Sequence, residues 1–189
     1  MLLTDFCERA MSYDAYTGLL GNNLEVHNLH YKKYTVSEAM QSILAKVKRI
    51  KILVLTEPWC GDSVAIVPVI KKIADEAPGW ELKVLLRDGN PELMDKYLTR
   101  GTRGIPVFIF LDEHCRALFS FGPRPEAAQK IFEFYRRDFR AGKIEKAEII
   151  KKIRSFYAKD RGRAIESELI RLMGERLFPV GSESFISAH

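Results

Sequence analysis

The sequence contains no apolar run that approaches the roughly 20 residues of a membrane-spanning helix. Residues 1–8 also lack the basic segment followed by an apolar stretch that marks a secretory signal. We therefore expect no membrane association and a cytoplasmic location. Of the 189 residues, 47% are apolar and 29% are charged, which excludes a wholly disordered chain.

Cysteine is scarce. Cys7, Cys60 and Cys115 are too few for a disulfide framework, and their odd number leaves at least one thiol free. Basic residues outnumber acidic residues only slightly, and the net charge is +5. Residues 123–176 hold 15 basic and 9 acidic residues, which are interleaved without a recognition motif. Nucleic acid is therefore not an expected partner, and the pattern does not indicate an oligomeric state.

Short β-branched runs alternate with helical segments. We predict strands at 50–56 and 80–87, joined by a helix at 63–77, which makes a βαβ unit with parallel strands. Strands at 107–111 and 116–121 form an antiparallel hairpin. Further helices are expected near 4–11, at 35–48 beginning with a capping box of Thr35 and Glu38, after Asn90, and at 125–141, 144–158 and 164–177. Residues from 178 onward are expected to form a loose tail.

One group of residues joins a predicted buried strand to the start of a helix: Trp59, Cys60, Gly61, Asp62 and Ser63. The free N–H groups at a helix start stabilise an anion, so a cysteine there favours its thiolate form. The thiolate is the nucleophile of disulfide exchange, and a neighbouring Trp offers a flat apolar contact. Pro68 should kink the following helix, and the Ile105–Pro106 bond is a candidate for a cis peptide.

With these residues, segment 37–141 resembles the thioredoxin family. The matching features occur in order: Trp59-Cys60-Gly61, Pro68, Arg103-Gly104-Ile105-Pro106, and Gly122 after the second hairpin strand. The resemblance implies a thioredoxin-like three-layer α/β/α fold with a mixed sheet. The expected division is an N-terminal extension at 1–34, the thioredoxin-like domain at 35–141, and extra C-terminal helices with a tail at 142–189.

The resemblance also implies a substrate site. The family's cis-proline corresponds to Pro106, beside Cys60, and the backbone of Ile105 would hydrogen-bond an extended peptide that carries the disulfide. Trp59, Gly61 and Asp62 would complete the groove. No metal or cofactor is implied, because an external thiol would serve as the reductant.

The departures from the family pattern decide the type of chemistry. Ser63 stands where the family usually has a second cysteine, so an outside thiol such as glutathione must release Cys60 from a mixed disulfide. Ser63 is expected to donate a hydrogen bond to the thiolate, whereas Asp62 and Glu57 place opposing negative charge nearby. Val54 and Val84 replace an acid and a lysine that assist the second cysteine in the family.

Two main functions remain open from the sequence, beside a structural or regulatory role such as that of a Cys60-linked dimer that senses oxidants. The first is a monothiol (CxxS) thiol–disulfide oxidoreductase with Cys60 as the nucleophile, acting on protein or small-thiol mixed disulfides. The second is a redox-inactive binding module of the same fold, because a fold does not fix a function. Cys115 should lie roughly 20 Å or more from Cys60. Whether Cys7 approaches Cys60 is open. His27 and His30 are expected to be surface or packing residues.

Overall fold

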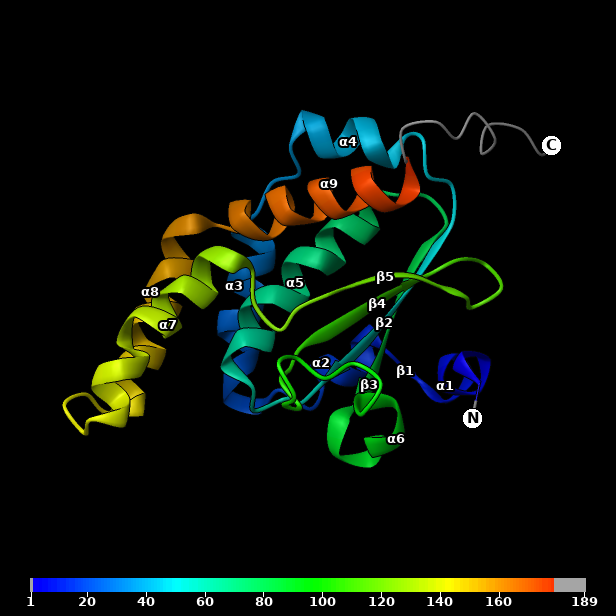
Figure 1. The fold of residues 1–189 in the computed structure, drawn as a ribbon. Helices are drawn as coiled ribbons and strands as arrows, with labels where there is room; N and C mark the ends of the chain where they lie inside the picture. The colour runs from blue at the N-terminus through cyan, green and yellow to red at the C-terminus, as the bar shows by residue number, and fades with distance from the viewer. Residues whose placement is uncertain (1, 179–189) are drawn as a thin grey trace.

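The computed structural model describes residues 2–178, in which a five-stranded sheet lies between two layers of helices (Figure 1). The strands are β1 (Met11–Ser12), β2 (Ile50–Thr56), β3 (Trp80–Leu86), β4 (Val107–Leu111) and β5 (Ala117–Phe121). The helices are α1 (Leu3–Arg9), α2 (Tyr13–Thr17), α3 (Leu24–Lys33), α4 (Glu38–Leu44), α5 (Gly61–Asp75), α6 (Pro91–Met94), α7 (Glu126–Arg140), α8 (Lys146–Asp160) and α9 (Arg163–Leu177), with short 3-10 turns η1 (Gly21–Asn23) and η2 (Arg87–Gly89). The predicted three-layer α/β architecture with a mixed sheet is confirmed.

The strand order β1-β3-β2-β4-β5 determines which loops meet. Strands β2 and β3 are parallel and are joined through α5, whereas β4 runs antiparallel to β2 and to β5. Leu55 near the end of β2 therefore pairs with Val107 at the start of β4. This pairing brings the loop after β2 beside the residues that precede β4, although the two segments are distant in the sequence.

Alternation along β2 separates two hydrophobic cores. Ile52 and Val54 belong to the larger core, under α4, α5, α8 and α9, whereas Leu53 and Leu55 belong to a smaller core under α1 and α6. Figure 1 shows α3, α5 and α9 on one side of the sheet and α1 and α6 on the other. Successive strand residues point to opposite faces, so a strand covered on both sides is apolar throughout, as predicted for 50–56.

Several predicted boundaries need correction. Ser37, not Thr35, begins α4: the Ser37 hydroxyl accepts from the Met40 N–H at 3.2 Å, and the Ser37 N–H donates to buried Glu166 on α9 at 2.8 Å. The helix ends at Leu44 rather than near residue 48. The predicted helix near 4–11 ends at Arg9, and α3 was not predicted. Helix α5 continues through Pro68.

The structure describes the C-terminal part of the chain only as far as Phe178. The predicted tail lies, apart from Phe178, outside the described residues. Within residues 2–178, no helix is long and apolar enough to cross a membrane.

His27 on α3 is fully buried in the wall of the larger core. Its Nε2 shares a hydrogen bond of 2.6 Å with the Tyr13 hydroxyl, and its Nδ1 has no partner among the described residues. Burial, aided by neighbouring His30, lowers the pKa of His27 from 6.5 to about 4. The prediction that His27 is a packing residue agrees with this position.

This burial predicts an acid-sensitive fold. Between pH 6.5 and about 4 the unfolded chain protonates His27 and the folded chain does not, so stability falls as the pH falls. This difference lowers the free energy of unfolding by about 1.4 kcal/mol per pH unit, or about 3 kcal/mol between pH 6.5 and about 4. Urea unfolding at several pH values should show a shallower acid limb for His27→Gln than for the wild type. Parallel acid limbs for the two proteins would contradict the assignment.

Candidate functional site

Cys60 lies at the junction between the sheet and α5. Its backbone N–H bonds the Glu57 carbonyl at 3.1 Å, its own carbonyl accepts from Val64 at 3.0 Å, and it is the residue that precedes the first turn of α5. The side chain is only 9% exposed and makes no capping hydrogen bond. The thiol instead donates to the carbonyl oxygen of Ile105 at 3.5 Å. The Cys60 sulfur is therefore held against the loop before β4.

The loop that meets Cys60 contains the expected cis peptide bond between Ile105 and Pro106. The sheet register brings this bond to the sulfur, since β4 begins one residue later. Gly122, the residue after β5, packs against it with φ +123°, and a Cβ atom there would lie 2.2 Å from the Pro106 carbonyl oxygen. Only glycine fits this approach, which accounts for the glycine that follows the hairpin.

Ser63 is fully buried in the first turn of α5, directly beneath the loop that carries Cys60. Its hydroxyl oxygen accepts a short hydrogen bond, 2.5 Å, from the Thr56 hydroxyl at the end of β2. Among the described residues the Ser63 hydroxyl bonds Thr56 and makes no hydrogen bond with Cys60, so its donation to the thiolate stays a prediction. Thr56 was not predicted as a site residue, because a threonine at a strand end carries no distinctive sequence signal.

Asp62 is held by two residues from the C-terminal half of the chain. Arg124, between β5 and α7, pairs with its Oδ2 at 2.7 Å, and the Tyr157 hydroxyl on α8 donates to its Oδ1 at 2.9 Å. Burial opposes the charge on Arg124, but Asp62 outweighs it and raises the pKa of the guanidinium. Burial and the Asp62 charge raise the pKa of Tyr157, which remains a donor. The negative charge that we expected to oppose the thiolate is therefore largely compensated.

Glu57 and Trp59, in the loop between β2 and α5, lie in different surroundings. Glu57 is buried and accepts from the Asp88 N–H at 2.9 Å. Trp59 is 60% exposed, and the Arg87 guanidinium lies 5.2 Å from the centre of its ring. The Trp59 ring is thus an exposed platform next to the buried thiol.

Tyr16 on α2 adds a donor that the sequence did not indicate. It is fully buried, and its hydroxyl makes no hydrogen bond of ordinary geometry with a described residue. Burial raises the pKa of Tyr16 to about 12, interaction with the Thr56 hydroxyl opposes this increase, and charge at Cys60 and Glu57 adds to it.

A basic pocket of about 380 Å³ opens beside the first turn of α5. Gly61 forms part of its wall, and the Arg154 guanidinium lies 3.4 Å from the position of a Cβ at Gly61. Lys33 and Arg161 also line the pocket, and no acidic residue does. Burial lowers the pKa of His30, which lines it too. The pocket therefore suits an anion with some apolar surface.

The two other cysteines do not join this site. Cys115 follows the β4–β5 turn, at the end of the sheet opposite the β2–α5 loop, and Cys7 lines one pocket with Cys115 and not with Cys60, although all three cysteines contact the smaller core. Within residues 2–178, no cluster of three histidine, cysteine or acidic side chains could hold a metal ion.

The ion pair of Asp62 and Arg124 predicts a kinetic effect on Cys60. Arg124→Gln leaves an uncompensated carboxylate in the first turn of the helix, which opposes formation of the thiolate. We expect Cys60 to react about tenfold more slowly with a chromogenic aromatic disulfide at pH 7 in a Cys7→Ser/Cys115→Ser background. The added change Asp62→Asn should restore the rate to within about twofold. An unchanged rate in a folded Arg124→Gln variant would show that the pair does not act on Cys60.

Comparisons with known proteins agree with this geometry. Residues 11–140 match the family model described as thioredoxin. A crystal structure of an HIV epitope scaffold superposes with a TM-score of 0.63 at 19% identity, covering 82% of this chain and 96% of the scaffold. A Pseudomonas aeruginosa protein of unknown function superposes with a TM-score of 0.59 at 19% identity, covering 85% of this chain and 95% of that protein. No curated protein matches the sequence. The chain belongs to the thioredoxin family.

Proposed function

We propose that the protein is a thiol–disulfide oxidoreductase of monothiol type, with Cys60 as its nucleophile. The observation that carries the proposal is the position of the Cys60 sulfur, at the start of α5 and 3.5 Å from the carbonyl of Ile105 before cis-Pro106. A helix start stabilises a thiolate, and the resemblance to thioredoxins implies that the loop before β4 pairs with an extended peptide.

Ionisation of Cys60 changes the role of its sulfur. The thiol donates to Ile105 in the described conformation, whereas a thiolate only accepts hydrogen bonds. The N–H groups of the first turn of α5 are the donors at the helix start, and we expect the Ser63 hydroxyl to join them. Release of the Ile105 carbonyl at the same step frees that group to accept from the backbone of a substrate.

The proposed reaction has two exchange steps. The Cys60 thiolate attacks the sulfur of the small thiol in a protein mixed disulfide; a bond to Cys60 forms, the original S–S bond breaks, and the protein thiolate leaves and takes up a proton. A second molecule of the small thiol, as its thiolate, then attacks the small-thiol sulfur of the Cys60 adduct. This step releases the Cys60 thiolate and a low-molecular-weight disulfide, so the small thiol is oxidised and the protein cysteine is reduced.

An external thiol is required because the chain offers no resolving cysteine at the site. Ser63 occupies the position of the family's second cysteine, and Cys7 and Cys115 lie at the other end of the sheet. The basic pocket beside Gly61 supports an anionic small thiol as the co-substrate, since Lys33, Arg154 and Arg161 complement carboxylates. The exposed Trp59 ring supports contact with the protein substrate. Reduced cysteines fit a reducing compartment, and we propose the cytoplasm.

The test is the removal of glutathione from a glutathionylated peptide, with reduced glutathione as the second thiol. We expect turnover that depends on the concentration of glutathione, and no turnover of a protein disulfide when the external monothiol is omitted. No acceleration over glutathione alone would rule the proposal out.

One observation favours the alternative, a redox-inactive module that binds protein. Cys60 is nearly buried with its thiol already bonded to Ile105, and the positions of the family's acid and lysine are filled by Val54 and Val84, which pair directly across β2 and β3. Such a module would bind an extended peptide equally well with or without the Cys60 sulfur.

A further inference from the structure

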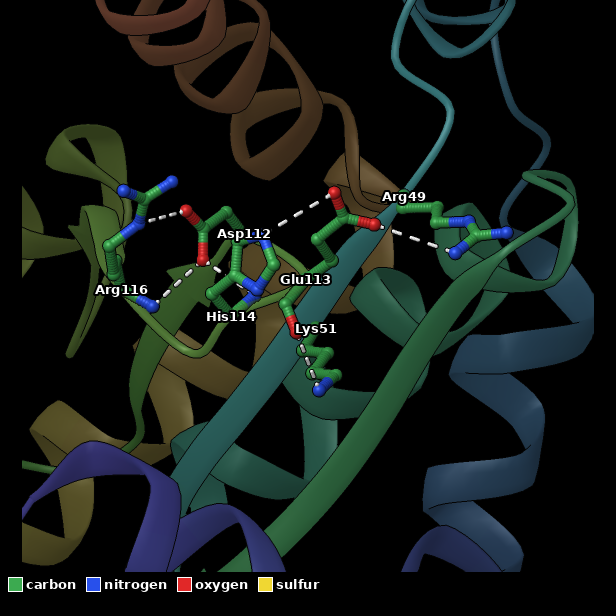
Figure 2. Close-up of polar contacts among 6 residues, drawn as sticks. All are labelled: Arg49, Lys51, Asp112, Glu113, His114 and Arg116. Atoms are coloured by element: carbon green, nitrogen blue, oxygen red, sulfur yellow. Dashed lines mark hydrogen bonds and ion pairs between the residues drawn. The ribbon is translucent and has the colours of Figure 1, made fainter. Parts of the chain in front are cut away.

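The turn between β4 and β5 holds Cys115 in a fixed, inward position. Asp112 organises the turn: its Oδ1 accepts from the N–H groups of His114 and Arg116 at 2.9 Å each (Figure 2). Its carbonyl accepts from the Cys115 N–H at 3.1 Å. Cys115 itself has φ +60°, a left-handed conformation that non-glycine residues seldom adopt. The residue is 7% exposed and packs in the smaller core.

Cys7 reaches the same place from α1, 108 positions earlier in the chain. It packs against the smaller core that contains Cys115, and the two side chains line one pocket of about 400 Å³. Burial raises the pKa of Cys7 to about 12, and the hydrogen-bonding and electrostatic interaction with Cys115 adds to this increase. The two thiols therefore face one pocket, Cys7 from α1 and Cys115 from the β4–β5 turn.

A lysine stands next to the other thiol. The Lys51 ammonium on β2 lies 3.5 Å from the Cys115 sulfur and donates to the Glu113 carbonyl at 2.9 Å, which holds it in place beside the turn (Figure 2). An ammonium group at this distance stabilises a thiolate. Lys83 on β3 contributes further positive charge to the pair. Cys115 is thus placed to attack a disulfide first, and Cys7 is placed to attack the mixed disulfide that results.

We propose that Cys7 and Cys115 form a second redox centre, separate from Cys60, that closes reversibly to an intramolecular disulfide when a low-molecular-weight disulfide is the oxidant. The Cys115 thiolate attacks one sulfur of the oxidant, which forms a mixed disulfide and releases one small thiolate. Cys7 then loses its proton to solvent and attacks the Cys115 sulfur, which releases the second small thiolate. Two protein thiols are oxidised and one small disulfide is reduced to two small thiols.

The surroundings suit this reaction and give it a structural consequence. The pocket that exposes both cysteines is lined by charges of both signs, Lys51 and Lys83 against Glu8, Glu81 and Glu113, which can pair with an oxidant that carries amino and carboxylate groups. The disulfide would link α1 to the β4–β5 turn. Because the sheet places this pair at the end opposite Cys60, its chemistry can be measured without the proposed active site.

The experiment uses the full chain with Cys60→Ser, so it is independent of the proposed function. After incubation with oxidised glutathione, we expect the intact mass to fall by about 2 Da, with a Cys7–Cys115 peptide found by mapping and reversal by dithiothreitol. Adding Cys7→Ser should trap one glutathionyl group on Cys115. Adding Lys51→Met to the Cys60→Ser chain should slow closure about tenfold.

Two results would overturn the proposal. One is stable glutathionylation of Cys7 and Cys115 without a disulfide, and the other is no reaction of either cysteine until the chain is unfolded in urea. The same peptide is also sought in the wild-type chain by differential alkylation, which needs no cysteine variant to fold, and its absence there would contradict the proposal equally.

Discussion

Cys60→Ser is expected to lower the rate of glutathione removal from a peptide by at least about 100-fold, because no other group at the site supplies a sulfur nucleophile. A serine hydroxyl at the start of α5 remains protonated at neutral pH and does not attack a disulfide. The side chain is isosteric enough to keep the contact with the Ile105 carbonyl, so the fold should survive. The measurement is the steady-state rate at saturating glutathione, with circular dichroism as the check on folding.

The matched control is the Cys7→Ser/Cys115→Ser chain, which removes the two cysteines at the other end of the sheet and should retain the wild-type rate. Equal activity in the Cys60→Ser chain and the wild type would refute Cys60 as the nucleophile. The binding module would be favoured instead if the wild type and both variants fail to remove glutathione and Cys60→Ser leaves the binding of an extended peptide unchanged.

Ser63→Cys is expected to convert the protein into a dithiol enzyme. Residue 63 lies one turn after Cys60 in α5, the spacing at which the family places its second cysteine. The new thiol should attack a mixed disulfide at Cys60 and release the substrate, so reduction of a protein disulfide with dithiothreitol should accelerate at least about tenfold over the wild type. The oxidised variant should also lose about 2 Da by closing a disulfide between residues 60 and 63.

Ser63→Ala is the control for this gain. It removes the hydroxyl that accepts from Thr56 and supplies no thiol, so it should lack the acceleration. A Ser63→Cys chain that folds, contains two free thiols at the site and still does not close a disulfide would mean that the geometry around Cys60 is unsuited to exchange. That outcome would count against the oxidoreductase and not merely against the role of residue 63.

The parts of the fold that the sequence predicted are those with local signals. The apolar run at 50–56, the helix that follows it and the hairpin at 107–121 each carry a periodicity or a turn within a short window, and they appear as β2, α5, β4 and β5. That Pro106 lies beside Cys60 could be predicted only from the resemblance to thioredoxins, because the sequence of neither segment indicates that the other is its neighbour. The antiparallel register of β2 and β4 supplies the physical reason.

The residues that the sequence missed are set by tertiary contacts. Arg124 and Tyr157 reach Asp62 across 62 and 95 positions, and neither lies in a recognisable motif. Cys7 and Cys115 are likewise brought together by α1 packing under the sheet, which the sparse pattern of the first 34 residues did not reveal. Burial of Tyr16 depends on the same segment. Side chains of this kind become predictable only once the packing of the two layers is known.

The rate at which Cys60 is alkylated tests the central claim most directly. In the Cys7→Ser/Cys115→Ser chain, iodoacetamide at pH 7 reports on Cys60 alone, and intact mass confirms a single adduct. The folded chain should react about tenfold faster than the same chain unfolded in urea, because the start of α5 and the nearby donors stabilise the thiolate. A folded chain that reacts more slowly than the unfolded one would contradict the account, since it would mean that burial against Ile105 keeps the thiol inert.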